Sequence, residues 1–294
     1  MWIAADWKDY HVLDTSDGEK LERWGDYLLI RPDPQVIWNT KKEHRGWHNS
    51  NGHYHRSAKG GGEWEFFDLP AEWSISYKEL VFRLKPFSFK HTGLFPEQAL
   101  NWDWFGRKIK ETGRELNILN LFAYTGGATL AAAAAGARVT HVDASKGMVG
   151  WAKENAEASS LSQAPIRWLV DDCVKFVSRE IRRGNKYDGI IMDPPSYGRG
   201  PKGEIWKIEH NIYELIQLTT QILSKDAIFY LINSYTTGLQ PGVLSYMLQT
   251  AIVPQWGGVV EADEIGLPVG DQSRQGSPNH LVLPCGASGR WWRC

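Results

Sequence analysis

Residues 117–143, NILNLFAYTGGATLAAAAAGARVTHVD, decide the fold. The apolar run NILNLF leads through a turn with two glycines into an alanine-rich segment, and a second apolar run, RVTHVD, follows. Strand, helix and strand in this order are typical of a parallel sheet with crossover helices. Gly136 lies between the helix and the second strand, where a left-handed residue commonly ends a helix.

The same alternation continues toward the carboxyl end. Helix-like and strand-like patterns follow in the order KGMVGWAKENAEAS (146–159), IRWLV (166–170), CVKFVSREIRR (173–183), YDGIIMD (187–193), HNIYELIQLTTQIL (210–223), AIFYLIN (227–233) and GVLSYMLQTA (242–251). Two last strands, near Val259–Gly266 and His280–Cys285, have no helix between them and are expected to be antiparallel. We therefore predict an α/β fold: a doubly wound, Rossmann-like sheet of seven strands whose last pair is antiparallel.

The first 86 residues have a different texture. Short β-branched and aromatic runs alternate with turn clusters: HVLDT (11–15), DYLLIRP (26–32), GEWEFFDLP (62–70), WSISY (73–77) and ELVFRLKP (79–86). This pattern predicts a small antiparallel β-domain. We expect three segments: the β-rich domain 1–86, an aromatic connector 87–116 that packs on the next domain, and the α/β domain 117–294.

Composition excludes several classes of protein. The 294 residues are 42% hydrophobic, and the net charge of -1 argues against a surface that is basic all over, as duplex binding would favour. No apolar stretch is long enough to span a bilayer, and the N-terminal residues carry charge, so we expect a cytoplasmic protein. Three widely spaced cysteines, Cys173, Cys285 and Cys294, predict reduced thiols and no structural metal.

Lys41–Lys59 is a local basic segment rich in histidine, and its Asn and Gly residues indicate a loop. It is open to two interpretations of similar weight, a solvated loop and an RNA-contacting loop; a histidine metal site is a weaker third. The 15 tryptophans include nine in the first 104 residues, and most are expected in the core, although an aromatic face can also stack an unpaired base.

Two features predict a nucleotide-type cofactor. Thr125, Gly126 and Gly127 lie between a buried strand and a helix N-terminus, where backbone amides can approach a negative group. Asp143 ends the next strand, where a carboxylate can accept both ribose hydroxyls. A tight turn and an ordinary acidic strand end would explain the same residues without a ligand. A nicotinamide dehydrogenase would also use a glycine-containing turn and an aspartate at a strand end.

The next two strand ends discriminate between these possibilities. Asp171-Asp172-Cys173 follows the third strand and DPPSY (193–197) follows the fourth, so four consecutive strand ends meet at one edge of the sheet. Asp172 is also placed to cap the following helix. In DPPSY, Pro194 and Pro195 form a rigid wall, Tyr197 can stack on a planar substrate, and Asp193 or a nearby carbonyl can accept a hydrogen bond from an exocyclic amine. Gly198–Gly203 is expected to be a mobile basic loop.

NLFAYTGGATL (120–130), VDAS (142–145), DDC (171–173) and DPPSY, in this order and spacing, resemble class I S-adenosylmethionine-dependent methyltransferases. The resemblance is to the bacterial 23S ribosomal RNA methyltransferase-like group, and it covers residues 87–235. GLFPEQ (93–98) is similar to that group's glycine-x-phenylalanine-x-aspartate-glutamine segment, with Glu97 in place of aspartate. The first 86 residues show no clear PUA-type signature.

The resemblance implies S-adenosylmethionine as cofactor and an RNA substrate contacted through DPPSY. The implied catalytic residues are Asp193, Pro194, Pro195 and Tyr197. The implied cofactor-binding residues are Phe95, Gln98, Phe122, Ala123, Tyr124, Thr125, Gly126, Gly127, Asp143, Ala144, Ser145, Asp172, Cys173 and Asp193.

The positions of the cysteines bear on which atom of the substrate is methylated. Methylation of cytosine carbon 5 needs a cysteine nucleophile, and neither DPPSY nor INSYTTG (232–238) contains one. Cys285, on the last strand, is more simply a buried structural thiol. We therefore expect a nitrogen target. Two alternatives stay open from the sequence: a cytosine carbon-5 RNA methyltransferase, and a non-catalytic protein that binds cofactor and RNA during ribosome assembly.

Overall fold

The computed structural model describes residues 1–57, 61–87, 90–199, 205–236, 238–270 and 281–293. The chain divides into two compact units. Unit 1 contains Met1, Asn101–Glu264 and Gly286–Cys294, and unit 2 contains Trp2–Leu100 and Ile265–Cys285. The last two strands of the chain therefore each pass from one unit into the other.

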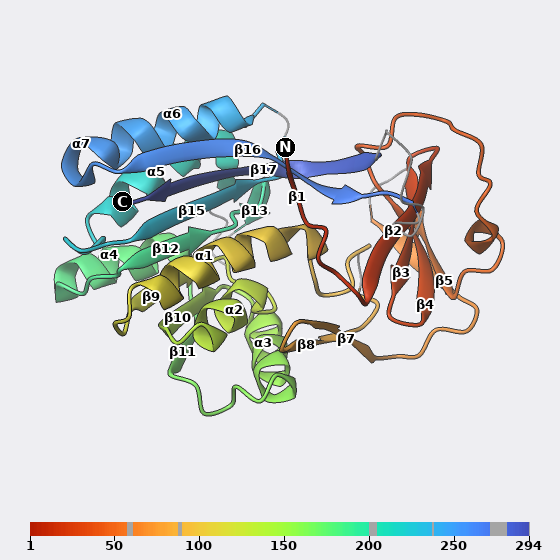
Figure 1. The fold of residues 1–294 in the computed structure, drawn as a ribbon, viewed down its shortest axis with the longest axis horizontal. Helices are drawn as coiled ribbons and strands as arrows, with labels where there is room; N and C mark the ends of the chain where they lie inside the picture. Colours follow the sequence, from red (N-terminus) through yellow and green to blue (C-terminus); the bar gives the residue numbers. More distant parts are fainter. Residues whose placement is uncertain (58–60, 88–89, 200–204, 237, 271–280, 294) are drawn as a thin grey trace. The chain divides into compact units, whose positions relative to one another are not determined.

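Unit 1 is an α/β structure in which strands and helices alternate along the chain (Figure 1). Its elements are α1 (Ala99–Glu111), β9 (Asn117–Leu121), α2 (Gly127–Ala134), β10 (Arg138–Asp143), α3 (Lys146–Ala158), β11 (Ile166–Val170), α4 (Cys173–Arg183), β12 (Gly189–Met192), β13 (Tyr197–Arg199), β14 (Ile205–Lys207), α5 (Ile208–Thr220), β15 (Phe229–Ser234), α6 (Pro241–Ala251), α7 (Val253–Trp256), β16 (Val259–Pro268) and β17 (Val282–Trp292).

The strand order of the main sheet is β1-β16-β17-β15-β12-β9-β10-β11. The pairs β15–β12, β12–β9, β9–β10 and β10–β11 are parallel, and β15–β17 is antiparallel. The predicted doubly wound sheet is confirmed. A two-residue strand, β1 (Trp2–Ile3), adds an eighth member beside β16. The last strand also runs to Trp292 rather than to Cys285, because Ala287–Trp292 pairs with β15.

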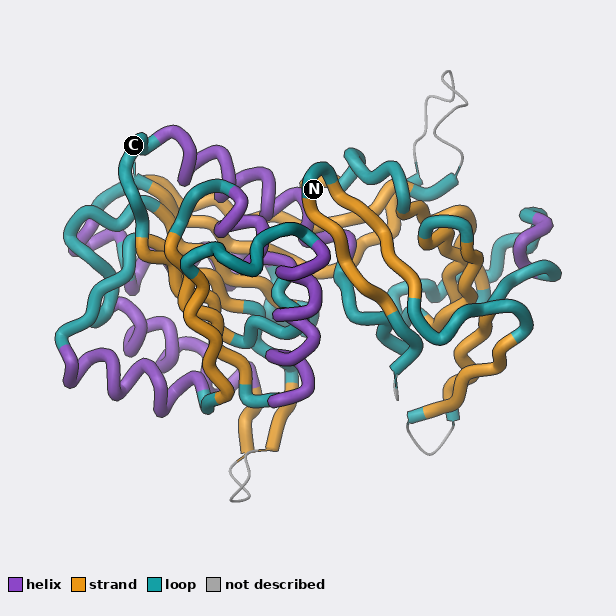
Figure 2. Tube along the Cα trace, turned by 90° about the horizontal axis from the view of Figure 1, so that it is seen from below, coloured by secondary structure: helices purple, strands orange, loops and turns teal. Residues whose placement is uncertain are grey.

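Helices cover both faces of this sheet (Figure 2). On one face, strand residues such as Leu119 and Ile190 join one buried cluster with Phe176 of α4, Leu215 of α5 and Leu248 of α6. Burial of this apolar area is the main stabilising term for the unit. On the other face α1 packs directly on the sheet, since Phe105 stacks on Phe229 with ring centroids 5.8 Å apart.

Unit 2 contains a five-stranded sheet of order β2-β3-β4-β5-β6 and a separate hairpin, β7–β8. Its elements are β2 (Tyr10–Ser16), β3 (Glu19–Trp24), β4 (Tyr27–Pro32), the 3-10 turn η1 (Arg45–Trp47), β5 (Gly52–Arg56), β6 (Gly62–Phe66), β7 (Trp73–Tyr77), β8 (Leu80–Leu84) and the 3-10 turn η2 (Pro96–Gln98). The predicted small antiparallel sheet is present. One pairing in it, β4 with β5, is parallel.

The expectation that residues 41–59 form a loop is wrong for part of this segment. Gly52–Arg56 forms β5 and pairs with all of β6, and Arg45–Trp47 forms a turn of 3-10 helix. In β5 the histidines flank Tyr54, which is buried, so the strand alternates inward and outward although its composition resembles a loop. Lys59 lies outside the described residues.

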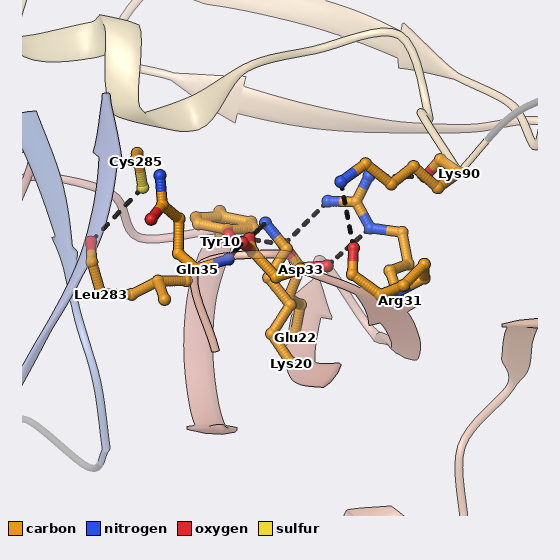
Figure 3. A network of polar contacts seen from close by, with 10 residues as sticks. Tyr10, Lys20, Glu22, Arg31, Asp33, Gln35, Lys90, Leu283 and Cys285 are labelled. Carbon is orange, nitrogen blue, oxygen red and sulfur yellow. Dashed lines mark hydrogen bonds and ion pairs between the residues drawn. The ribbon is translucent and has the colours of Figure 1, made fainter. Parts of the chain in front are cut away.

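A buried charge cluster, the Glu22 cluster, links β2, β3 and β4 of unit 2 (Figure 3). The Glu22 carboxylate accepts hydrogen bonds from the Arg31 guanidinium at 2.6 and 2.8 Å and from the Tyr10 hydroxyl at 2.7 Å. Lys20 lies 3.5 Å from Glu22 and 3.2 Å from Asp33. The Glu22 side chain is fully buried, so its charge is stabilised by these partners rather than by water.

We expect Glu22→Gln to lower the free energy of unfolding by about 3 kcal/mol, because it leaves the buried Arg31 charge without its carboxylate. Urea denaturation measures this. Glu43→Gln is the matched control, since it removes an exposed pair with Lys41 and is expected to change stability by less than ~0.5 kcal/mol. Equal effects of the two variants would contradict a structural role for the cluster.

The same cluster predicts acid sensitivity. Burial alone would raise the pKa of the Glu22 carboxyl, but Arg31, Lys20 and the Tyr10 hydroxyl lower it from 4.5 to about 2. A depressed pKa adds stability above pH 4.5, and this contribution is lost as pH falls from 4.5 toward 2. The free energy of unfolding should therefore fall more steeply over this range in the wild type than in Glu22→Gln.

Candidate functional site

The candidate site lies at the carboxyl ends of four parallel strands of unit 1. In the register of the sheet, Leu121 at the end of β9 stands opposite Val142 of β10 and Met192 of β12. The chain order switches here, because β10 and β11 lie on one side of β9 and β12 and β15 on the other. Open α/β sheets bind ligands at such a switch point.

The loop after β9 has an unusual backbone. Phe122, Tyr124 and Gly126 have φ angles of +55°, +49° and +90°, so the left-handed conformation recurs at every second residue. Such conformations are costly for residues other than glycine and cluster where a ligand is held. α2 starts directly afterwards, at Gly127, and its N-terminal amides favour a negative group. Ala123 and Thr125 complete this cofactor loop, which we define as Phe122–Gly127.

α3 holds the cofactor loop from behind. The fully buried Asn155 donates through Nδ2 to the Thr125 carbonyl at 2.9 Å. A Cβ atom at Gly126 would lie 3.0 Å from the Ala152 Cβ, so the approach of α3 also requires glycine there. Asn155 was not predicted from the sequence as a site residue. The available signal was a polar residue on the buried stripe that includes Ala152 and Ala156.

Asp143 at the end of β10 is tied to the same loop. Its Oδ2 accepts from the Tyr124 amide at 2.8 Å, and its Oδ1 accepts from the Ser145 amide at 2.8 Å. Burial raises the pKa of the Asp143 carboxyl, although the hydrogen bonds from the Ser145 and Tyr124 amides act to lower it. Ala144 is exposed, and Ser145 caps α3 by accepting from the Met148 amide, as predicted. Each Asp143 oxygen keeps acceptor capacity for a further donor.

Asp172 and Cys173 follow β11. Asp172 is the N-cap of α4, since its Oδ1 accepts from the Lys175 amide at 2.9 Å, and so the capping interpretation of this residue is confirmed. The Cys173 thiol is buried and accepts from the Phe122 amide at 3.4 Å, which links α4 to the cofactor loop. Binding of an adenine amine by Asp172 stays a prediction, as does the role of the Cys173 amide.

The segment Asp193–Tyr197, here called the reaction segment, follows β12 beside the cofactor loop. The Asp193 amide donates to the Leu121 carbonyl at 3.4 Å, and the Ser196 hydroxyl bonds that of Thr236 at 2.5 Å. Pro194 is buried, whereas Tyr197 is 48% exposed. Tyr197–Arg199 is strand β13, so the expected loop over Gly198–Gly203 is wrong for Gly198 and Arg199; residues 200–203 lie outside the described residues.

Several predicted site residues belong to unit 2. Phe95 precedes the turn η2 and Gln98 ends it, and the Gln98 side chain is buried. The 41–59 segment and Cys285 also belong to unit 2. The predicted contacts of these residues with cofactor or RNA stay predictions.

The donor set at the strand ends of unit 1 fits a nucleoside cofactor. A carboxylate suits a ribose diol, a second carboxylate one strand away suits an adenine amine, and the amides of a glycine-containing loop suit an anionic tail. Within the described ranges, no group of three or more His, Cys, Asp or Glu side chains is arranged to hold a metal ion. None of the helices in the described part of the chain is long and apolar enough to cross a membrane.

Comparison with known proteins agrees with this geometry. Residues 35–228 match the model of a family described as S-adenosylmethionine-dependent methyltransferase. A solved S-adenosylmethionine-dependent methyltransferase from Agrobacterium tumefaciens is 36% identical, with a TM-score of 0.93 over 100% of this chain and 93% of that one.

Curated relatives match a shorter part of the chain. Ribosomal RNA large subunit methyltransferase K/L of Shewanella frigidimarina is 34% identical over 145 residues, which are 49% of this chain and 20% of the relative. Ribosomal RNA large subunit methyltransferase K of Neisseria meningitidis is 32% identical over 130 residues, 44% of this chain and 37% of the relative. The matches thus span only a fifth to a little over a third of these relatives.

We expect Asp143→Ala to raise the Kd for S-adenosylmethionine by about 30-fold or more. The variant leaves the Tyr124 and Ser145 amides without an acceptor and removes the proposed ribose acceptor, together worth ~2 kcal/mol or more. Isothermal titration calorimetry measures the Kd.

Asp188→Ala is the matched control for this experiment. Asp188 accepts from the Asn117 amide at 2.9 Å, at the amino end of the same sheet, so its loss costs stability without touching the candidate site. The folded control should bind the cofactor with unchanged Kd. Normal binding by Asp143→Ala would contradict the assignment.

Proposed function

We propose, from the premise that this chain belongs to the S-adenosylmethionine-dependent methyltransferase family, that it transfers the methyl group to a base of ribosomal RNA. The observation that carries the proposal is the reaction segment, with its exposed Tyr197, directly beside the cofactor loop. An exposed aromatic next to a Pro-Pro wall suits a planar base that has been turned out of its stack. The ribosomal RNA methyltransferase relatives support the choice of RNA.

The cofactor supplies an electrophilic methyl group when bound. We assign its ribose hydroxyls to Asp143, its adenine amine to Asp172 and its adenine edge to the Cys173 amide. The cofactor loop, Ala144, Ser145 and Asp193 complete the proposed site in unit 1, and Phe95 and Gln98 of unit 2 are proposed to cover it. Hydrogen bonds to the Asn155 and Asp143 side chains fix the backbone of the cofactor loop without the cofactor, so the site is preorganised.

The residues of the reaction segment have distinct proposed roles. Tyr197 stacks on the base, Pro194 and Pro195 fix its approach, and the Asp193 carboxylate accepts a hydrogen bond from the target amine. Orientation and removal of water are the main sources of rate in such a transfer, because a nitrogen nucleophile needs no covalent intermediate with the enzyme. Asp193 receives the proton that the methylated nitrogen releases.

The environment of the cysteines supports a nitrogen target over carbon 5 of cytosine. Burial raises the pKa of the Cys173 thiol well above its usual range, and burial next to the Glu97 charge does the same for Cys285. A thiol with a raised pKa is a weak nucleophile near neutral pH. Cys294 lies outside the described residues.

Unit 2 is proposed to help bind RNA, through the basic segment 41–59. Lys41 and Arg45 are solvent-accessible, whereas Lys42 pairs with Glu19 at 2.8 Å. We propose the cytoplasm as the location. We also propose that the segments 1–86, 87–116 and 117–294 act as RNA-binding domain, cofactor-covering connector and catalytic domain.

A strain that lacks the gene should lose one methylated base in its ribosomal RNA, as mapped by mass spectrometry. Purified wild-type protein should restore that methyl group to the isolated RNA. Asp193→Ala should lower the rate at saturating S-adenosylmethionine by at least about 100-fold, since it removes the proton acceptor. Unchanged ribosomal RNA in the deletion strain would refute the substrate.

Cys285→Ser and Cys173→Ser should keep methyl transfer within a few-fold of the wild type, because neither thiol is expected to attack the base. Radiolabel transfer to RNA from the deletion strain measures the rate. Complete loss of activity in a folded variant that still binds cofactor would indicate a cysteine nucleophile and hence cytosine carbon 5.

A further inference from the structure

Trp206 of β14 contacts both halves of the candidate site. Its indole Nε1 donates to the Pro195 carbonyl at 2.7 Å, and its ring lies 5.5 Å from the ring of Phe122 in the cofactor loop, at an angle of 47°. The ring is half-buried and packs with Phe122 against the core cluster of unit 1. One side chain therefore touches the reaction segment and the cofactor loop at once.

The reaction segment is difficult to hold in place by its own backbone. Pro194 and Pro195 have no amide N–H, so hydrogen bonds can hold their backbone only through the carbonyl groups. Trp206 binds the Pro195 carbonyl, and the Ile208 amide binds that of Ser196 at 3.1 Å. Both donors lie where β14 meets α5, since Trp206 belongs to β14 and Ile208 is the first residue of α5.

Trp206 also acts on Tyr197 through the β13–β14 hairpin. Tyr197 pairs with Lys207 and Gly198 pairs with Trp206, so the strand that carries Trp206 is hydrogen-bonded to the strand that begins at Tyr197. Phe122, whose ring contacts the indole, is itself held by the hydrogen bond that its amide donates to the Cys173 sulfur. A change in the indole position would move Tyr197 and Pro195 relative to the cofactor loop.

We infer that Trp206 is a positioning residue that sets the reaction segment at the correct distance from the cofactor loop for methyl transfer. The inference rests on the proposed role of Asp193–Tyr197 as the reaction centre. Transfer reactions are sensitive to such placement, since a misplacement of about 1 Å can cost roughly 100-fold in rate. The hydrogen bond of Trp206, rather than its bulk alone, is assigned this role.

Trp206→Phe keeps an aromatic ring and removes the indole N–H. We expect kcat for RNA methylation to fall by about 10-fold or more, with KM for RNA and Kd for S-adenosylmethionine each within about 3-fold of the wild type. Trp256→Phe is the matched control. Trp256 belongs to the same buried cluster and donates to the Ser224 carbonyl at 2.8 Å, outside the candidate site, so its kcat should stay within about 2-fold.

Hydrogen exchange supplies a readout that needs no RNA substrate. Trp206→Phe should speed exchange in peptides 193–199 and 205–212, and Trp256→Phe should not. A kcat loss shared by both variants, or unchanged kcat and exchange in Trp206→Phe, would overturn the inference. Faster exchange in Trp206→Phe alongside a wild type that methylates no ribosomal RNA would refute the proposed substrate and leave the positioning role standing.

Discussion

The parallel pairing of β9 with β10 on one side and β12 on the other is the constraint on which the rest of unit 1 depends. The ladder continues just beyond the strands: the Ala123 amide bonds the Val142 carbonyl, and the Asp193 amide bonds that of Leu121. Because the strands run in one direction and end at one level, a loop, a carboxylate and a proline segment from three distant parts of the sequence must meet.

The strand ends at this site are held in place by side chains that form hydrogen bonds with backbone groups rather than with other side chains. The left-handed residues Phe122 and Tyr124 each cost roughly 1–3 kcal/mol. Asp143 and Cys173 accept from their amides and so offset part of this cost. A ligand that bonds the second lone pairs of Asp143 meets a carboxylate already oriented by the protein, which reduces the entropy lost on binding.

The sequence was sufficient for the parts of the structure that depend on local pattern. Apolar strands buried on both faces, the capping Ser145 and the left-handed Gly136 all have local signatures, and the doubly wound sheet follows from their order. β3 and β5 were missed because Glu22 and the histidines of β5 make buried or half-buried strands look polar. Asn155 and Trp206 were missed because each bonds a carbonyl of a residue that is distant or in another element, and only tertiary structure defines such a partner.

Unit 2 is assembled from two segments that are far apart in the sequence, and this has a consequence for biosynthesis. Residues 265–285 complete it: Val269 forms a β-bridge with Val12, and the Gly270 amide donates to the Val12 carbonyl at 3.0 Å. Domains usually fold in the order in which they leave the ribosome. Here nearly all of unit 1 separates the two segments of unit 2 in the sequence, so unit 2 can be completed only after most of unit 1 has been translated.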